Sequence, residues 1–243
     1  MKLLRTLFSR KQPPASLCTA VIVAAGSSTR MGGIDKMFTP IGGEPVVLHT
    51  LRAFQQAEEI DEIVLVTRED LMVPMGTLCS QHGIHKVCRV VKGGADRTQS
   101  VMAGLREVSP QTEFVAIHDG ARPFVTGEVI ARTVQSARAH SAAAPAIPVK
   151  DTIKRAVDGV VQETPDRRAL FAVQTPQVFA LPLIQGALAK AEEDGVLLTD
   201  DCGAVERLGF PVRLVEGSEE NIKVTTPADL LHGEAILAER MGL

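Results

Sequence analysis

The chain is organised around one stretch, Val21-Ile-Val-Ala-Ala-Gly-Ser-Ser-Thr-Arg-Met-Gly-Gly-Ile-Asp-Lys36, in which an apolar run passes directly into a polar loop. Residues 19–23 are small or β-branched, which is typical of a parallel strand covered on both faces. An anion can approach the backbone of the loop closely because four residues there carry little side chain: Ala24, Ala25, Gly26 and Ser28. Arg30 and Lys36 add positive charge. The stretch therefore predicts a buried strand followed by a phosphate-binding loop.

The composition indicates one soluble domain. A chain of 243 residues, 45% of them hydrophobic and 23% charged, can bury one large core, so we assign residues 18–243 to a single domain. Residues 1–17 are basic and lack the long apolar centre of a secretory signal, so we expect a mobile extension. The four scattered cysteines favour a reducing, cytoplasmic location over a disulfide framework.

Two classes of partner are excluded on the same grounds. The net charge of −3 gives no global attraction to nucleic acid, and the absence of Trp and Tyr removes the usual base-stacking side chains. No apolar run approaches the roughly 20 residues of a membrane span. We therefore expect neither a nucleic-acid nor a membrane partner, and any anion site must be a local cluster of cations.

Apolar strand patterns alternate with helical patterns along most of the chain. After the first strand we expect strands at 60–67, 87–91, 114–117 and 142–148, with helices between them, one of these at 101–108. This alternation is typical of an α/β fold with a mostly parallel, doubly wound, Rossmann-like sheet. It breaks down over residues 149–177, which predict a protruding β-arm with too little apolar material for its own core. The arm should therefore lie on something else, such as a second subunit.

Two further polar loops follow predicted strands. They are Lys92-Gly-Gly-Ala-Asp-Arg-Thr-Gln-Ser100 and His118-Asp-Gly-Ala-Arg-Pro123. In open α/β sheets ligands bind outside the carboxyl ends of the strands, so the three loops indicate one crevice. Asp119, at the end of the strand predicted over 114–117, suits Mg²⁺ held together with substrate phosphates, although a carboxylate there can also cap the following loop.

Other candidate motifs have a simpler structural interpretation. Thr199-Asp200-Asp201 suits a helix start, with Thr199 as the N-cap. Lys223 lies in an apolar–polar alternation at 221–225, and is either an edge-strand lysine or a cation aimed into the crevice. The run Cys79, His82, His85 and Cys88 lacks the two separated ligand pairs of structural zinc sites.

The first loop does not fit the common nucleotide-binding fingerprints. A dinucleotide fingerprint needs three glycines at fixed positions, and only Gly26 is present in the corresponding run. No Gly-Lys-Ser/Thr follows, so a Walker loop is also excluded. An anion loop with Arg30 and Lys36 reaching in remains, which suits a triphosphate.

Six motifs extend this interpretation to nearly the whole chain. They are Ala24-Ala-Gly-Ser-Ser-Thr-Arg-Met31 with Lys36, Gly93-Gly-Ala-Asp-Arg-Thr-Gln-Ser100, His118-Asp-Gly-Ala-Arg-Pro123, Asp151-Thr-Ile-Lys154, Thr175-Pro-Gln177 and Asn221-Ile-Lys-Val-Thr225. In this order the set resembles the 2-C-methyl-D-erythritol 4-phosphate cytidylyltransferases of the non-mevalonate isoprenoid pathway. The resemblance implies a nucleotidyltransferase that uses CTP and a polyol phosphate and releases pyrophosphate.

The resemblance also implies roles for individual residues. The catalytic cations would be Arg30, Lys36 and Lys223, and Asp119 would bind Mg²⁺ or another divalent cation. The nucleotide would be bound by Ala24, Ala25, Gly26, Ser28, Arg30, Lys36, Gly94, Asp96 and Ser100. The methylerythritol phosphate would contact Asp119, Arg122, Thr175 and Lys223, with Thr152 and Arg167 reaching the same site from the partner subunit's arm in a homodimer.

The chain departs from the family pattern at a few positions. Ser28 and Gly120 stand where the family usually has Gly and Ala, Met37 stands where Gln is frequent, and Ala95 occupies a position that is often acidic or polar. Three alternatives remain open: a ribitol 5-phosphate cytidylyltransferase, a non-catalytic nucleotide-binding protein and, least favoured, a dehydrogenase.

Overall fold

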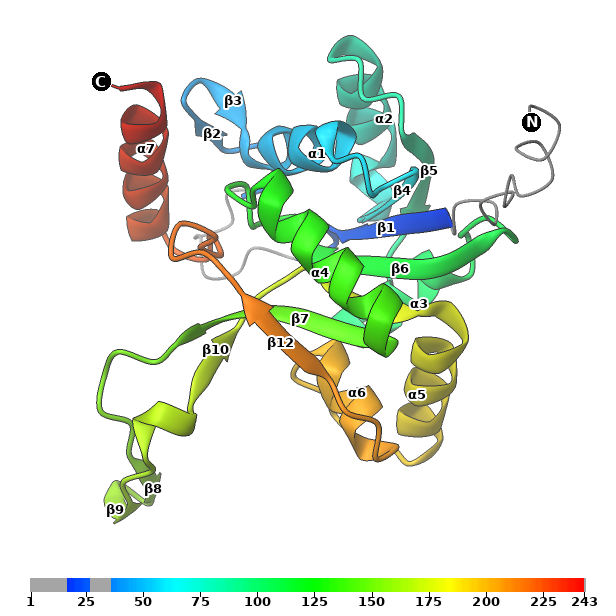
Figure 1. Ribbon diagram of the computed structural model, residues 1–243. Coiled ribbons are helices and arrows are strands. Elements are labelled where there is room, and N and C mark those ends of the chain that lie inside the picture. The colour runs from blue at the N-terminus through cyan, green and yellow to red at the C-terminus, as the bar shows by residue number, and fades with distance from the viewer. Residues whose placement is uncertain (1–16, 27–35, 243) are drawn as a thin grey trace, which may run out of the picture.

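An eight-stranded sheet forms the centre of the computed structural model, which describes residues 17–26 and 36–242 (Figure 1). Neighbouring strands follow the order β10-β7-β11-β6-β1-β4-β5, and β12 also pairs with β7. The strands are β1 (Leu17–Val23), β4 (Glu62–Thr67), β5 (Val87–Lys92), β6 (Thr112–Asp119), β7 (Ala142–Pro148), β10 (Phe171–Val173), β11 (Gln177–Ala180) and β12 (Arg213–Glu216). Of the expected N-terminal extension, residues 1–16 lie outside the described residues, and Leu17 already belongs to β1.

Most of the sheet is parallel. β1 pairs in parallel with β4 on one side and β6 on the other, and β4–β5 and β7–β12 are also parallel. β11 lies antiparallel between β6 and β7, and β10 is also antiparallel to β7. The prediction of a mostly parallel, doubly wound α/β sheet is therefore confirmed.

Helices cover both faces of the sheet, as α1 and α2 on one side and α5 and α6 on the other show in Figure 1. Side chains alternate between the faces along β1, where Ala20 and Ile22 join one buried cluster and Val21 joins the other. The first cluster is completed by α1 (Val46–Gln56), α2 (Met72–Gln81) and α4 (Gly127–His140). The second is completed by α3 (Arg97–Leu105), α5 (Leu181–Glu193) and α6 (Asp201–Arg207). β1 is thus buried on both faces, as its composition predicts.

The remaining elements are peripheral. The C-terminal helix α7 (Pro227–Met241) packs beside the short hairpin of β2 (Pro40–Ile41) and β3 (Glu44–Pro45) through a third apolar cluster that includes Phe124. Single 3₁₀ turns lie at Glu69–Leu71 and Arg167–Ala169. No helix within the described part of the chain is long and apolar enough to cross a membrane.

Two local expectations were wrong. Helix α3 begins at Arg97 rather than at 101, because the Asp96 side chain accepts a hydrogen bond from the Gln99 N–H (2.8 Å) and caps the helix there. The N-cap of α6 is Asp200, whose carboxylate accepts from the Gly203 N–H, rather than Thr199. Residues 221–225 form no strand, so of the two alternatives left open for Lys223 the edge-strand one does not apply.

Residues 149–177 contain a hairpin that stands away from the body of the structure (Figure 1). Its strands, β8 (Arg155–Val157) and β9 (Val160–Glu163), pair only with each other. All seven residues of these strands are exposed, including Val157, Val160 and Val161. The C-terminal part of the segment returns to the main sheet as β10.

Helix α3 packs close to the sheet at Gly104, which has no Cβ. A Cβ at Gly104 would lie 2.5 Å from Cγ1 of Val21 and 2.8 Å from Cγ2 of Val66, both buried and β-branched. Stiff side chains such as these cannot rotate out of the way. Gly104 therefore fixes how near α3 lies to β1 and β4.

His118 is a buried polar group at the end of β6. Its ring lies 4.7 Å from the ring of Phe54, and its Nε2 lies 3.2 Å from the Arg122 carbonyl oxygen. Since a carbonyl can only accept, Nε2 carries the proton, and Nδ1 accepts from the Thr175 hydroxyl (3.0 Å). Burial lowers the pKa of His118 to about 3, so the imidazole is neutral in the folded protein at neutral pH.

The close packing of α3 gives a test of the fold. Gly104→Ala should lower the free energy of unfolding by about 1–3 kcal/mol, because the added methyl group overpacks the contact with Val21 and Val66. Gly186→Ala is the matched control, since a Cβ there in α5 meets nothing within 4 Å, and it should raise this free energy by about 0.4–1 kcal/mol. Urea unfolding with an unchanged m-value measures both. Equal effects of the two substitutions would contradict the packing argument.

The neutral state of His118 predicts a pH dependence of stability. The unfolded chain binds a proton at the ordinary imidazole pKa of about 6.5, whereas the folded chain binds it only near a pKa of about 3. Stability from this group is therefore present above about pH 6.5 and is lost as the pH falls, at a rate approaching about 1.4 kcal/mol per pH unit. His118→Gln should flatten the dependence of the unfolding free energy between about pH 6.5 and 4.5. Parallel curves for wild type and variant in urea unfolding would refute this account.

Candidate functional site

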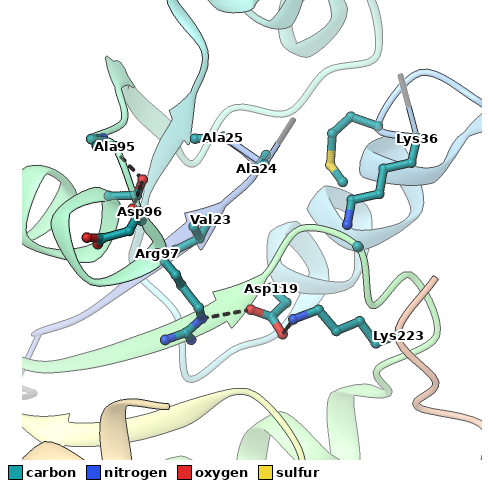
Figure 2. Close-up of a pocket in the computed structure, with 14 residues that line it drawn as sticks. Val23, Ala24, Ala25, Lys36, Ala95, Asp96, Arg97, Asp119 and Lys223 are labelled. Carbon is teal, nitrogen blue, oxygen red and sulfur yellow. Dashed lines mark hydrogen bonds and ion pairs between the residues drawn. The ribbon is translucent and has the colours of Figure 1, made fainter. Parts of the chain in front are cut away.

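A pocket of about 290 Å³ lies at the carboxyl ends of β1, β5 and β6. This is the edge at which the three polar loops were expected to meet. Figure 2 shows Asp119 near its centre, with Lys36 extending toward the same space. The lining residues are Val23, Ala24, Ala25, Gly26, Lys36, Met37, Gly94, Ala95, Asp96, Arg97, Ser100, Asp119, Ala121 and Lys223.

The loops leave the sheet side by side because backbone pairing continues one residue past each strand. The N–H of Ala24 donates to the Val66 carbonyl (2.7 Å), and the N–H of Gly120 donates to the Val23 carbonyl (2.8 Å). A Cβ at Gly93 would lie 2.5 Å from the Ala25 Cβ, so glycine is required where the first two loops touch. Small residues therefore let the backbones approach one another and leave the pocket open above them.

The second loop is held in shape by its own helix. The Ser100 hydroxyl donates to the Asp96 carbonyl (2.8 Å) and accepts from the Gly94 N–H (3.1 Å). The Ala95 N–H donates to Oε1 of Gln99 (3.0 Å). Asp96 and Ser100, expected to bind nucleotide, thus also fix the loop that lines the pocket.

The Asp119 carboxylate is surrounded by cationic side chains at the pocket. Its Oδ2 lies 2.8 Å from Nζ of Lys223 and 3.7 Å from Nε of Arg122, and its Oδ1 accepts from Nε of Arg97 (3.2 Å). Burial alone raises the pKa of Asp119, but the charges of Arg97 and Lys223 outweigh it and hold this pKa well below its usual range. The carboxylate is therefore ionised, and Lys223 is directed into the pocket.

Arg97 makes a second, stronger contact behind the pocket. Its Nη1 and Nη2 donate to the two carboxylate oxygens of Asp201, at 2.9 and 2.7 Å. Although burial lowers the pKa of Arg97, the Asp201 carboxylate raises it, so the guanidinium stays charged. Neither residue was assigned to the site from the sequence. Arg97 was not singled out because the helix was expected to start only at 101. Asp201 was interpreted only as part of a helix start.

Arg122 and Thr175 lie against Asp119 but do not line the pocket. Arg122 donates through Nη1 to the Asn221 carbonyl (2.7 Å), which holds the segment that carries Lys223. The Thr175 hydroxyl accepts from the Asp119 N–H (3.2 Å) while donating to His118. Arg122 therefore helps to position the segment of Lys223, and Thr175 helps to position Asp119.

The remaining predicted site residues lie elsewhere. Thr152 and Arg167 are exposed on the segment that carries the arm, where Arg167 donates to the Lys150 carbonyl (3.0 Å). Ser28 and Arg30 lie outside the described residues.

Among the described residues, no cluster of metal ligands surrounds Asp119. Within residues 17–26 and 36–242, no group of three or more carboxylate, thiol or imidazole side chains could hold a metal ion. Cys79, His82, His85 and Cys88 lie within the residues that this search covers.

The pocket suits a polyphosphate ligand. Cations from three segments, Lys36, Arg97 and Lys223, lie with the small-residue loop Ala24–Gly26 around one space. Backbone N–H groups at a strand end and nearby ammonium groups are a common arrangement for holding phosphates. The charge and shape of the site therefore match those of a chain of phosphates.

Comparison with known proteins agrees with this chemistry. The family model described as 2-C-methyl-D-erythritol 4-phosphate cytidylyltransferase matches residues 18–239. A protein of this name from Caldanaerobacter subterraneus subsp. tengcongensis is 48% identical over 90% of this chain and 98% of its own length. The protein of this name from Halalkalibacterium halodurans is also 48% identical, over 91% of this chain and 97% of its own.

Solved structures give the same result. The 4-diphosphocytidyl-2C-methyl-D-erythritol synthase from Anaerococcus prevotii superposes with a TM-score of 0.83 at 32% identity, covering 92% of this chain and 96% of that one. The 2-C-methyl-D-erythritol 4-phosphate cytidylyltransferase from Thermus thermophilus superposes with a TM-score of 0.74 at 33% identity, covering 89% and 97%. The chain belongs to the 2-C-methyl-D-erythritol 4-phosphate cytidylyltransferase family.

Proposed function

We propose that the protein transfers a cytidylyl group from CTP to 2-C-methyl-D-erythritol 4-phosphate in the non-mevalonate pathway to isoprenoids. Family membership supports the substrates, and the convergence of Lys36 and Lys223 on one pocket beside the Ala24–Gly26 loop supports the chemistry. Of these observations, the position of Lys223 at the pocket supports the proposal most strongly, because the sequence left open whether this side chain points into the crevice.

The reaction needs no covalent intermediate. An oxygen of the acceptor phosphate attacks the α-phosphorus of CTP, a new O–P bond forms, the bond to the β-phosphate oxygen breaks, and pyrophosphate leaves. Negative charge gathers on the oxygens around the α-phosphorus in the transition state. Lys36 and Lys223, which line the pocket, would stabilise that charge together with Arg30, and the Ala24–Gly26 loop would align the triphosphate.

Asp119 is the residue that would hold Mg²⁺ or another divalent cation. Both of its oxygens have cationic partners, but a carboxylate offers about four lone pairs, and Mg²⁺ in nucleotide sites takes one or two carboxylates with substrate phosphates. The donor set therefore fits the ion only together with the triphosphate. When bound, Mg²⁺ would neutralise phosphate charge and help to orient the nucleotide.

A homodimer in the cytoplasm is part of the proposal. The exposed Val157, Val160 and Val161 on the arm give it an apolar surface that a second subunit would cover, and Thr152 and Arg167 would then reach that subunit's pocket. The cysteines of the described residues are all free thiols, in keeping with a reducing compartment. Sedimentation at working concentration tests the assembly, and a monomer that is fully active would contradict the shared site.

The decisive measurement is pyrophosphate release with each nucleoside triphosphate and each candidate acceptor. We expect release with CTP and methylerythritol phosphate, and much less with ATP, GTP or UTP. Ribitol 5-phosphate is the competing acceptor, and the relatives named above favour methylerythritol phosphate over it. CTP binding by calorimetry without turnover on either acceptor would indicate a non-catalytic nucleotide-binding protein.

Lys36 provides a test of the mechanism. Lys36→Ala should lower kcat by roughly 10²-fold, because the ammonium group acts on charge that develops in the transition state. Lys190→Ala, which removes an exposed lysine of α5 that does not line the pocket, is the control and should leave kcat unchanged. An unaltered kcat in Lys36→Ala would remove this residue from the mechanism.

A further inference from the structure

Arg97 joins a carboxylate inside the pocket to one buried behind it. Its N–H donors reach both: Nη1 and Nη2 bind Asp201 as a bidentate pair, and Nε donates to Asp119. Because the guanidinium is planar, these two carboxylates are held at a fixed angle to each other. Figure 2 shows Arg97 on one side of Asp119 and Lys223 on the other.

Asp201 is itself anchored to the sheet. It is 1% exposed, and its N–H donates to Oε1 of Gln177 (2.9 Å), a residue of β11, which lies between β6 and β7. Nε2 of the same glutamine donates to the Asp200 carboxylate (2.9 Å). The guanidinium of Arg97 therefore rests on a rigid framework rather than on a surface side chain.

Lys223 holds Asp119 in a different way. Its side chain is 37% exposed, it comes from a segment without helix or strand, and its ammonium group sits on a flexible four-carbon stem. The Arg97 side chain is 27% exposed and has its strongest contact away from the pocket. Of these two partners of Asp119, Lys223 is thus the exchangeable one and Arg97 the fixed one.

We propose that Arg97, held by Asp201, is a positioning residue that keeps the Asp119 carboxylate in place while Lys223 moves from Asp119 to the substrate phosphates. This inference rests on the proposed function. Binding of a polyphosphate draws the Lys223 ammonium toward the new negative charge, and Asp119 then loses its closest cation. Arg97 keeps the carboxylate compensated and oriented through that exchange. Asp119 would then hold a divalent cation or contact the acceptor from an unchanged position.

The position of Arg97 in the chain adds a second consequence. It is the first residue of α3, directly after the Gly94–Asp96 loop that lines the nucleotide side of the pocket. A simple disturbance of that loop would weaken CTP binding, whereas loss of positioning at Asp119 would slow the chemical step. The two effects separate in KM for CTP and kcat.

The test uses Arg97→Lys in the full-length protein, because lysine keeps the charge but lacks the planar guanidinium that binds Asp201 through two nitrogens and Asp119 through a third. We expect kcat to fall by roughly 10- to 100-fold, as misplacement of a reacting group does, with the KM for CTP changed by less than about twofold. Arg106→Lys, at the exposed far end of α3, is the matched control and should match wild type. A raised KM for CTP at unchanged kcat would overturn the proposal, because it would assign Arg97 to loop structure.

A double-mutant cycle with Asp119→Asn tests whether the effect of Arg97 on the rate is exerted through Asp119. If Arg97 acts through Asp119, Arg97→Lys should cost less than about twofold in single-turnover rate once the carboxylate has been removed by the Asp119→Asn substitution. An equal loss in both backgrounds would show that Arg97 acts independently, and would overturn the proposal. Wild-type protein without CTP-dependent turnover would instead refute the proposed function.

Asp201→Asn keeps the test valid if Arg97→Lys does not fold. It retains the shape of the anchor and leaves Arg97 and its charge in place, but it removes the charge that fixes the guanidinium. We expect kcat to fall in this variant too. When Asp201→Asn is added to Asp119→Asn, the rate should be no lower than that of Asp119→Asn alone. An unchanged kcat in Asp201→Asn, with a thermal midpoint showing the protein folded, would also contradict the proposal.

Discussion

The site depends on keeping one buried carboxylate, Asp119, ionised at the end of a central strand. An ionised group that is 7% exposed is costly unless charges offset it, and here the offset comes mainly from Arg97 and Lys223, with Arg122 at a longer distance. Arg97 and Lys223 are in turn placed by different parts of the fold, α3 for the first and the segment before α7 for the second. The arrangement is stable only when sheet, helix and C-terminal segment are all in position.

The sheet makes this possible by bringing backbones close together. Gly93 and Gly104 each occupy a place where a Cβ would collide with a buried or loop side chain. Because the loops after β1 and β5 and the helix α3 approach so closely, the pocket is lined on one side mainly by backbone and methyl groups. Charged side chains then enter from the opposite side, as Lys36 and Lys223 do.

Much of the fold follows from the sequence. Continuous apolar runs identified the parallel strands, and the polar loops after them correctly indicated one crevice, because the carboxyl ends of parallel strands share an edge. The start of α3 was missed because Asp96 caps the helix before the apolar pattern begins. The pair of Arg97 with Asp201 spans 104 residues, and no local pattern reports a contact of that kind. The direction of Lys223 likewise depends on Asp119, a tertiary neighbour.

The order of the strands also has a consequence for biosynthesis. The central strand β6 pairs on its second side with β11, which comes late in the chain. Asp201, which holds Arg97 against Asp119, and Lys223, which contacts Asp119 directly, also come late in this chain of 243 residues. A ribosome-bound chain that has released β1 to β7 carries the loops and Asp119 but neither Asp201 nor Lys223. Such a nascent chain can begin the sheet, yet its pocket holds a carboxylate without its closest counter-charge. The site therefore matures last, and prematurely terminated chains would lack it even where most of the sheet has formed.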